Sequence, residues 1–481
     1  MQTKPEEWKT IYIIFFVMYS VNIFIRGLDE NKIMNRSYMF MKQYNVCIVG
    51  GGSTYTLGFL KSFARMQDEF PLNKLVLFDI DEKRQQPIGK FGEILFSEKM
   101  PELKFSYTTD AKEAYEDMDF IFMQMRAGGL EMRAKDEHIP LSMGLIGQET
   151  CGAGGMAYGL RSCVDMIKAI HEIRKYSPNA WILNYSNPAA IVAEALRREF
   201  PEDQRILNIC DQPENVVRSC SRLLGCDWED LDPVYFGLNH FGWFTHIYNK
   251  TTGEDLLPKI KELIKENGFL PQDAEQRDQS WLDTYGMVQT IMNDFPDFLP
   301  NTYDQYYLYP DYKASHLNPN FTRADEVMAG REKRVFRECE EIIREGKIGE
   351  KLENISDAHA EMMIKVAEAI AFNKNNRHIL IVENNGAIAN MQNDAMVEVV
   401  CELGINGPRP MRVGNIPQFY LGLLVNQVSS EKLLVDAYFE NSYNKALQAF
   451  TINRLVNDAK KARTLLDALI EANKGMWPEL K

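Results

Sequence analysis

From residue 44 to residue 225, short apolar runs alternate with stretches of helical periodicity. The runs have the length of buried strands, and a helical pattern follows them. Such alternation requires parallel strands joined by crossover helices. The expected strands lie at 45–50, 74–78, 104–108, 119–125, 180–184 and 205–209. Strands with such connections predict an α/β fold with a Rossmann-like, doubly wound parallel sheet.

Two proline-containing corners follow the last two expected strands. Asn187 precedes Pro188, and Gln212 precedes Pro213, each just ahead of a helical pattern. A capping side chain followed by proline at the first helical position is a typical helix start. The sequence NICDQP (208–213) is therefore predicted to be a strand-to-helix corner, on the sheet edge where such folds bind ligands.

The pattern changes after residue 226, where aromatic and less regular sequence is followed by long helical stretches. A chain of 481 residues is long enough for two domains. We expect a nucleotide-binding domain at 41–225 and a mixed α+β substrate and catalytic domain at 226–481.

Residues 11–25 form a strongly apolar run ahead of the first expected strand. The run is shorter than the roughly 20 residues that a spanning helix needs, and it lacks a basic flank and a small-residue cleavage site. We therefore expect residues 1–40 to be a misplaced start or a dispensable extension, with Met41 as one candidate start. A membrane anchor is the alternative.

Charge and cysteine usage narrow the functional classes. The net charge of -14 disfavours nucleic acid as a partner but leaves a small anionic substrate possible. The 8 cysteines are scattered and include no CxxC pair, which indicates a reducing, cytoplasmic compartment.

The segment VGGGSTY (49–55) lies between the first expected strand and the next helix. Gly50, Gly52 and Ser53 suit a loop that approaches a pyrophosphate, although the third fingerprint glycine is replaced by Tyr55. Asp79 ends the second expected strand, where a carboxylate favours the ribose of NAD over that of NADP. The alternatives are a merely tight turn and a capping role for Asp79.

Seven blocks in order carry a wider resemblance: GGGST, IGQETCGAGG, LNYSNPAA, NICDQP, GLNHFGW, LPNTYDQYYLYP and VENNGAIAN. Over about 41–478 the sequence resembles glycoside hydrolase family 4, and within it the 6-phospho-α-glucosidase branch. Cys210 or His240 alone would more often be a core residue. The resemblance implies that both bind a divalent metal, typically Mn²⁺, although a thiolate and an imidazole by themselves prefer zinc or copper.

The resemblance also implies roles for other residues. Asp211 would protonate the leaving group and Tyr303 would act as the base, while Arg133, Asn187 and Arg323 would hold the substrate. NAD would take a hydride from carbon 3 of the sugar and return it after elimination and water addition, so the net reaction is hydrolysis. Family members assemble as dimers or tetramers, so a homo-oligomer is implied.

Residue 211 decides the expected linkage. The 6-phospho-α-glucosidases of this family carry Cys-Asp here, and the 6-phospho-β-glucosidases carry Cys-Asn. The pair Cys210-Asp211 therefore predicts hydrolysis of α-linked 6-phosphorylated disaccharides such as maltose 6'-phosphate. The alternatives are a 6-phospho-β-glucosidase, an NAD-dependent hydroxy-acid dehydrogenase, and a catalytically silent NAD-sensing or membrane-tethered module.

Overall fold

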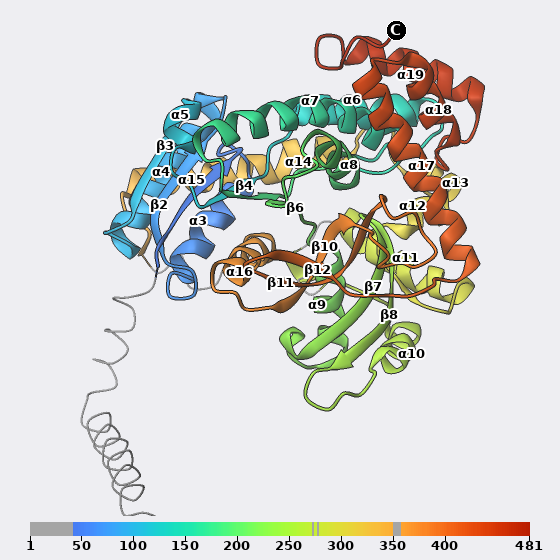
Figure 1. Ribbon diagram of the computed structural model, residues 1–481, viewed down its shortest axis with the longest axis horizontal. Coiled ribbons are helices and arrows are strands. Elements are labelled where there is room, and N and C mark those ends of the chain that lie inside the picture. Colours follow the sequence, from blue (N-terminus) through green and yellow to red (C-terminus); the bar gives the residue numbers. More distant parts are fainter. Residues whose placement is uncertain (1–41, 272–273, 277–278, 350–356) are drawn as a thin grey trace, which may run out of the picture.

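The computed structural model of the protein describes residues 42–271, 274–276, 279–349 and 357–481. Its described strands form a 12-stranded sheet in the order β3-β2-β1-β4-β5-β6-β10-β11-β7-β8-β9, with β12 paired to β11. Figure 1 shows this sheet running from the blue N-terminal half into the green and orange half. The predicted extension at 1–40 lies outside the described residues.

The first half of the sheet is parallel throughout, and it confirms the predicted Rossmann-like fold. Its strands are β1 (Tyr44–Val49), β2 (Leu72–Phe78), β3 (Lys104–Thr108), β4 (Phe120–Met123), β5 (Trp181–Asn184) and β6 (Ile206–Asn208). The order reverses between β1 and β4, which is the switch point where doubly wound sheets bind nucleotides.

Helices cover both faces of this parallel half: α3 (Thr56–Arg65), α4 (Glu82–Lys99), α5 (Ala111–Tyr115), α6 (Gly129–Ser142), α7 (Gly152–Tyr176) and α8 (Ala189–Glu199). The next helix, α9 (Gln212–Leu224), packs instead on the second half of the sheet. Alternate residues of β1 serve opposite faces, because strand side chains have a period of two. Ile48 is buried in one core with Phe59 of α3, and Cys47 is buried in another with Met156 of α7.

The second half of the sheet is antiparallel. Its strands are β7 (Leu231–Leu238), β8 (Phe241–Asn249), β9 (Leu299–Pro300), β10 (Asn376–Glu383), β11 (Met396–Gly404) and β12 (Gly407–Pro410). β10 joins the two halves by pairing Ile381 with Asn208 of β6. The domain boundary at residue 226 stays a prediction, and one sheet extends across it.

Several of the remaining helices pack against helices of the first half. The later helices are α10 (Leu257–Asn267), α11 (Gln279–Asp294), α12 (Asp304–Leu308), α13 (Pro310–His316), α14 (Arg323–Val327), α15 (Lys333–Glu345), α16 (Ala358–Ala371), α17 (Gln418–Glu440), α18 (Tyr443–Ile452) and α19 (Ala459–Ala472). α15 and α16 pack on α4 and α3, and α17 and α19 pack on the layer of α6, α7 and α8 (Figure 1). No helix in the described part of the chain combines the length and apolar character that crossing a bilayer requires.

The two predicted corners begin helices as expected, but their capping differs from the prediction. α8 begins after Pro188, which occupies the cap position itself, and the Asn187–Pro188 peptide is cis. α9 has Asp211 at its cap position, without a hydrogen bond from its side chain to the helix backbone. The prediction that Asn187 caps α8 was therefore wrong. Its proline neighbour takes that position, which leaves the Asn187 side chain to line a cavity.

A buried ion pair links three helices of the first half. Arg161 on α7 binds Asp136 of α6 through Nη2–Oδ2 at 2.5 Å and Nη1–Oδ1 at 3.1 Å. Arg161 Nη1 also donates to Asn473 Oδ1 at 2.5 Å, just after α19. Both charged side chains are almost completely excluded from solvent.

Replacing Arg161 with Met should lower the free energy of unfolding by about 3–5 kcal/mol, because it leaves the Asp136 carboxylate buried without its partner. Chemical denaturation measures this loss. Arg409→Met is the matched control, since Arg409 is exposed and its contacts with Glu402 and Asn375 lie at the surface. Equal stabilities of the two variants would contradict a structural role for the buried pair.

Candidate active site

A cavity of about 640 Å³ lies at the carboxyl ends of the parallel strands and reaches the second half of the molecule. Of the predicted residues, five line it: Asn187, Cys210, Asp211, His240 and Tyr303. Asn187 follows β5, and Cys210 and Asp211 follow β6. His240 lies in the turn between β7 and β8, and Tyr303 follows β9. Residues far apart in the sequence therefore meet at the edge that the strand pattern predicted.

Cys210 and His240 form the candidate metal pair. Cys210 Sγ lies 3.4 Å from His240 Nε2, and both side chains are buried. His240 has a φ of 62°, a left-handed conformation uncommon for a residue with a Cβ, and it occupies the tight turn between the two strands. The turn thereby places an imidazole beside the Cys210 thiol, two residues after the end of β6.

The environment of this pair suits a cation. Burial, reinforced by Glu398 and Asp211, raises the pKa of the Cys210 thiol well above its ordinary value. Burial lowers the pKa of His240 to about 4, which keeps the imidazole neutral with a lone pair for a ligand. A bound cation would deprotonate the thiol and use that lone pair.

These donors are too few to complete a coordination shell. The described residues contain no cluster of three or more His, Cys, Asp or Glu side chains placed for one ion. The two donors fit a site that keeps open positions for substrate oxygens, as catalytic metal sites do.

The ring of Tyr303 stacks on that of His240 in the candidate metal-binding pair. Its ring lies 4.3 Å from that of His240 between centroids, with the planes 12° apart. Burial raises the pKa of Tyr303 well above its ordinary value. The phenol therefore needs a nearby positive charge before it can act as a base.

Asp211 belongs to a network that the sequence did not reveal. Its Oδ1 accepts a hydrogen bond from Tyr185 Oη at 2.6 Å, and its Oδ2 lies 2.6 Å from His359 Nδ1. Burial opposes both charges, yet the pKa of His359 rises to about 10 beside Asp211, and His359 in turn lowers the pKa of Asp211. The two groups form an ion pair on the cavity wall, in which Asp211 is buried and His359 is partly exposed.

Tyr185 and His359 were missed for different reasons. Tyr185 directly follows β5, so its place at a parallel strand's carboxyl end was a usable signal. His359 lies in the first turn of α16, 148 positions after Asp211 by their residue numbers (359 − 211). Nothing in its local sequence distinguishes it from a surface histidine.

The glycine loop fits a nucleotide. Gly50 has a φ of 90°, and a Cβ there would lie 3.0 Å from the Gln124 carbonyl of the neighbouring strand end. Ser53 N–H donates to Gly50 O at 2.9 Å, closing the turn ahead of α3. Within the described structure, no side chain caps α3, although Thr56 N–H and Gly58 N–H donate to the backbone carbonyls of Ser53 and Tyr55. The positive end of the helix dipole remains available to an anion.

Asp79 is joined to this loop. Its Oδ2 accepts a hydrogen bond from Gly52 N–H at 2.7 Å, so the acidic residue and the glycine turn form one unit. The cap of α4 is Asp81, which accepts from Arg84 N–H. The alternative that Asp79 caps this helix is therefore wrong, and its role at the ribose of a nucleotide stays a prediction.

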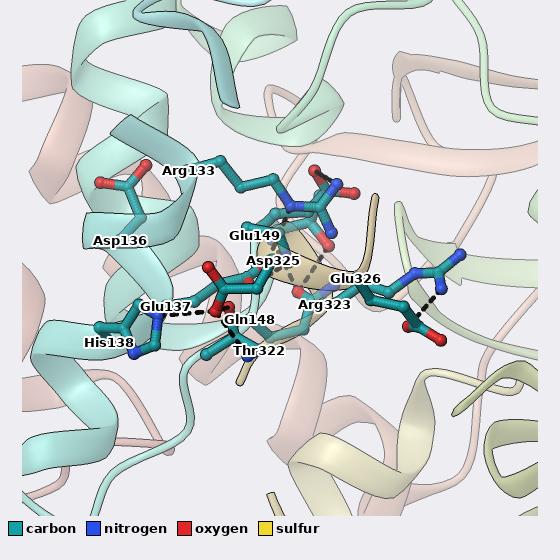
Figure 2. Close-up of polar contacts among 12 residues, drawn as sticks. Arg133, Asp136, Glu137, His138, Gln148, Glu149, Thr322, Arg323, Asp325 and Glu326 are labelled. Atoms are coloured by element: carbon teal, nitrogen blue, oxygen red, sulfur yellow. Dashed lines mark hydrogen bonds and ion pairs between the residues drawn. The ribbon is translucent and has the colours of Figure 1, made fainter. Parts of the chain in front are cut away.

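The two predicted phosphate ligands are not among the residues that line the cavity, and Figure 2 shows both of them held by neighbouring carboxylates. Arg133 of α6 is buried and bonds Glu137 at 2.8 Å and Glu149 at 3.0 Å. Arg323, at the start of α14, pairs with Glu326 and donates to Ser280 Oγ at 3.3 Å. Their predicted role in binding substrate stays a prediction.

Glu149 connects this arginine layer to the cavity, which it lines. It also accepts from Arg126 at 2.8 Å. Burial opposes its charge, but Arg133 and Arg126 lower the pKa of Glu149 from 4.5 to about 2. Because the folded pKa is depressed, the carboxylate stabilises the protein above pH 4.5, and this contribution is lost as the pH falls toward 2.

Glu149→Gln should therefore lower the free energy of unfolding by about 3 kcal/mol at pH 6, and the deficit should shrink as the pH falls below 4.5. Denaturation of parent and variant at a series of pH values measures it. Glu172→Gln is the control, because Glu172 pairs with Lys175 at the surface. A deficit for Glu149→Gln that is constant with pH would contradict the assigned ion pairs.

Comparison with known proteins now identifies the family. The family model described as family 4 glycosyl hydrolase matches residues 45–226, and that of the family 4 glycosyl hydrolase C-terminal domain matches residues 235–456. The chain therefore belongs to glycosyl hydrolase family 4, as its sequence motifs predicted.

Similar proteins extend the comparison to nearly the whole chain. Phospho-alpha-glucosidase PagL of Clostridium acetobutylicum is 52% identical over 444 residues, which cover 92% of this chain and 100% of PagL. A crystal structure of a 6-phospho-alpha-glucosidase from gut microorganisms, in complex with NAD and Mn²⁺, is 80% identical with a TM-score of 0.91. A second, in complex with NAD and glucose 6-phosphate, is 44% identical with a TM-score of 0.87. Each structural match covers 92% of this chain and 100% of the other.

Proposed function

We propose that this protein is a 6-phospho-α-glucosidase that hydrolyses α-linked, 6-phosphorylated disaccharides of the maltose 6'-phosphate type. The observation that carries the proposal is the Cys210-Asp211 pair at the carboxyl end of β6, with His240 3.4 Å from the thiol. The α-glucosidase names of the similar proteins support the α linkage.

We propose NAD and Mn²⁺ as the cofactors, supported by the ligands of a neighbour that is 80% identical. When bound, they supply a reversible hydride acceptor for carbon 3 of the sugar and a positive charge for two of its oxygens. Gly50, Gly52, Ser53 and Asp79 would hold the nucleotide through the loop and the α3 N-terminus. Cys210 and His240 would hold the metal through sulfur and nitrogen.

The cavity residues would then divide the chemistry. Tyr303, stacked on His240, takes the proton from carbon 2 once carbon 3 is a ketone. Asp211 gives a proton to the glycosidic oxygen as its bond to carbon 1 breaks and the electron pair stays on the oxygen. Asn187 lines the same cavity and offers an amide to the sugar hydroxyls.

The phosphorylated sugar is supported by glucose 6-phosphate in one neighbour. For this chain we assign the phosphate to Arg133 and Arg323, because a guanidinium can hold two phosphate oxygens at once. Arg323 would exchange Glu326 for the phosphate, since the described structure pairs these two side chains.

Compartment and assembly complete the proposal. All eight cysteines are free thiols in the structure, which supports a reducing cytoplasm. A homo-oligomer, either a dimer or a tetramer, follows from the family resemblance.

Purified protein should hydrolyse maltose 6'-phosphate and p-nitrophenyl α-glucoside 6-phosphate only when NAD and Mn²⁺ are both present. Unphosphorylated maltose should react far more slowly, because it has no phosphate group for Arg133 and Arg323 to bind. A substrate panel with each cofactor omitted in turn measures this. Stoichiometric NADH formation without sugar release would instead favour a hydroxy-acid dehydrogenase, and preference for the β-linked substrate would overturn the linkage.

Cys210→Ala should weaken Mn²⁺ binding at least ~10-fold, because one of the two protein donors is lost. Equilibrium binding of Mn²⁺ to the protein, followed by the magnetic resonance signal of the free ion, measures affinity independently of turnover. Cys226→Ala is the matched control, since Cys226 is exposed and outside the cavity lining. Unchanged Mn²⁺ affinity in Cys210→Ala would exclude the thiol as a ligand.

A further inference from the structure

His359 has the geometry of a second participant in proton delivery to the leaving group. Its Nδ1 lies 2.6 Å from Asp211 Oδ2 and 2.6 Å from Tyr185 Oη, and Tyr185 Oη lies 2.6 Å from Asp211 Oδ1. Asn215 Nδ2 also donates to Asp211. Each carboxylate oxygen of Asp211 therefore already faces a donor.

The contacts among Tyr185, Asp211 and His359 lie on the cavity wall, where a bound substrate has access to them. Tyr185, Asp211, Asn215 and His359 all line the cavity that holds Cys210 and His240. The imidazole comes from α16, whereas Asp211 follows β6, so two distant parts of the chain build the contact. The ring of Tyr55 packs edge-on against His359 at 5.0 Å between centroids and fixes its plane.

A donor and acceptor 2.6 Å apart can pass a proton with little movement. A carboxyl group that must lose and regain a proton in each turnover gains from such a partner, because the charge left behind is neutralised in a buried site. The raised pKa of His359, about 10 beside Asp211, agrees with an imidazole that carries a proton in this contact.

We propose that His359 is a positioning residue that acts through Asp211, and that the two side chains share the proton delivered to the leaving-group oxygen. This inference rests on the proposed glycosidase function and deepens it. Tyr185 holds the other carboxylate oxygen, so that the shared proton has one defined direction.

The proton inventory closes over one turnover. The pair loses one proton to the glycosidic oxygen when the bond from that oxygen to carbon 1 breaks, and the bonding electrons remain on the oxygen. The water that adds to carbon 1 returns one proton to the pair, and its hydroxyl oxygen forms the new bond. Tyr303 separately removes the carbon 2 proton, which exchanges with solvent, and later returns a proton to carbon 2.

The leaving group distinguishes this role from a purely structural one. A sugar alkoxide is a strong base and needs a proton to depart, whereas p-nitrophenolate is a weak base and departs without one. Loss of proton delivery should therefore impair maltose 6'-phosphate far more than the aryl substrate. Damage to cofactor binding or to the fold would impair both equally.

The test compares kcat/KM for maltose 6'-phosphate and p-nitrophenyl α-glucoside 6-phosphate in the complete enzyme with NAD and Mn²⁺. His359→Gln should lose about 10²–10⁴-fold on the disaccharide and under ~10-fold on the aryl substrate. Asp211→Asn should show the same selectivity. The double variant should be no slower than Asp211→Asn, because the two residues act as one unit.

His359→Asn provides a second variant, since its amide can donate from near the Nδ1 position but cannot give up a proton. It should fold and bind NAD like the parent, by equilibrium binding, yet keep the selective loss on the disaccharide. His171→Asn is the matched control: it breaks another histidine–carboxylate contact, with Glu199 at 2.7 Å, outside the cavity lining. It should leave both rates unchanged.

Three results would overturn the inference. They are equal losses on both substrates, full recovery of disaccharide hydrolysis in His359→Asn, and additive losses in the double variant. A parent enzyme that hydrolyses neither substrate would instead refute the proposed function, and the inference with it.

Discussion

The pairing of β6 with β10 is the contact on which the candidate site depends. Ile381 of β10 pairs with Asn208, two residues before Cys210, and it continues the parallel sheet into the antiparallel half. β11 then pairs with β7, and the β7–β8 turn carries His240 back to the end of β6. Asn239 in that turn bonds the buried Glu398 of β11 at 3.1 Å, which fixes the approach of His240 to the thiol.

Burial then gives the two sides of the cavity opposite electrostatic characters. Around Cys210, His240 and Tyr303, the exclusion of water favours neutral forms, so a cation is the natural means of activating them. Asp211 and His359 remain charged because each neutralises the other at 2.6 Å. One side is thus suited to acidify carbon 2, and the other to move a proton at the leaving oxygen.

Local sequence patterns predicted the features that depend on residues close together along the chain. The strand periodicity and the corner at Asp211 gave the parallel sheet and the edge that holds the cavity. The pattern could not predict that Pro188 would take the cap position from Asn187, or that Glu149 and Glu326 would pair with Arg133 and Arg323. Those outcomes depend on contacts between distant elements. The contact of His359 with Asp211 is of the same kind, because His359 lies on α16, which packs beside α3. Resemblance to a family added roles for residues, but not their partners.

Exchange at carbon 2 tests the central claim most directly, because only oxidation at carbon 3 makes that hydrogen acidic. Maltose 6'-phosphate labelled with deuterium at carbon 2 of its phosphorylated glucose would be hydrolysed in ordinary water, and the glucose 6-phosphate would be analysed by mass spectrometry. The proposed mechanism predicts loss of the label to solvent during turnover. Full retention of deuterium in the product would contradict it.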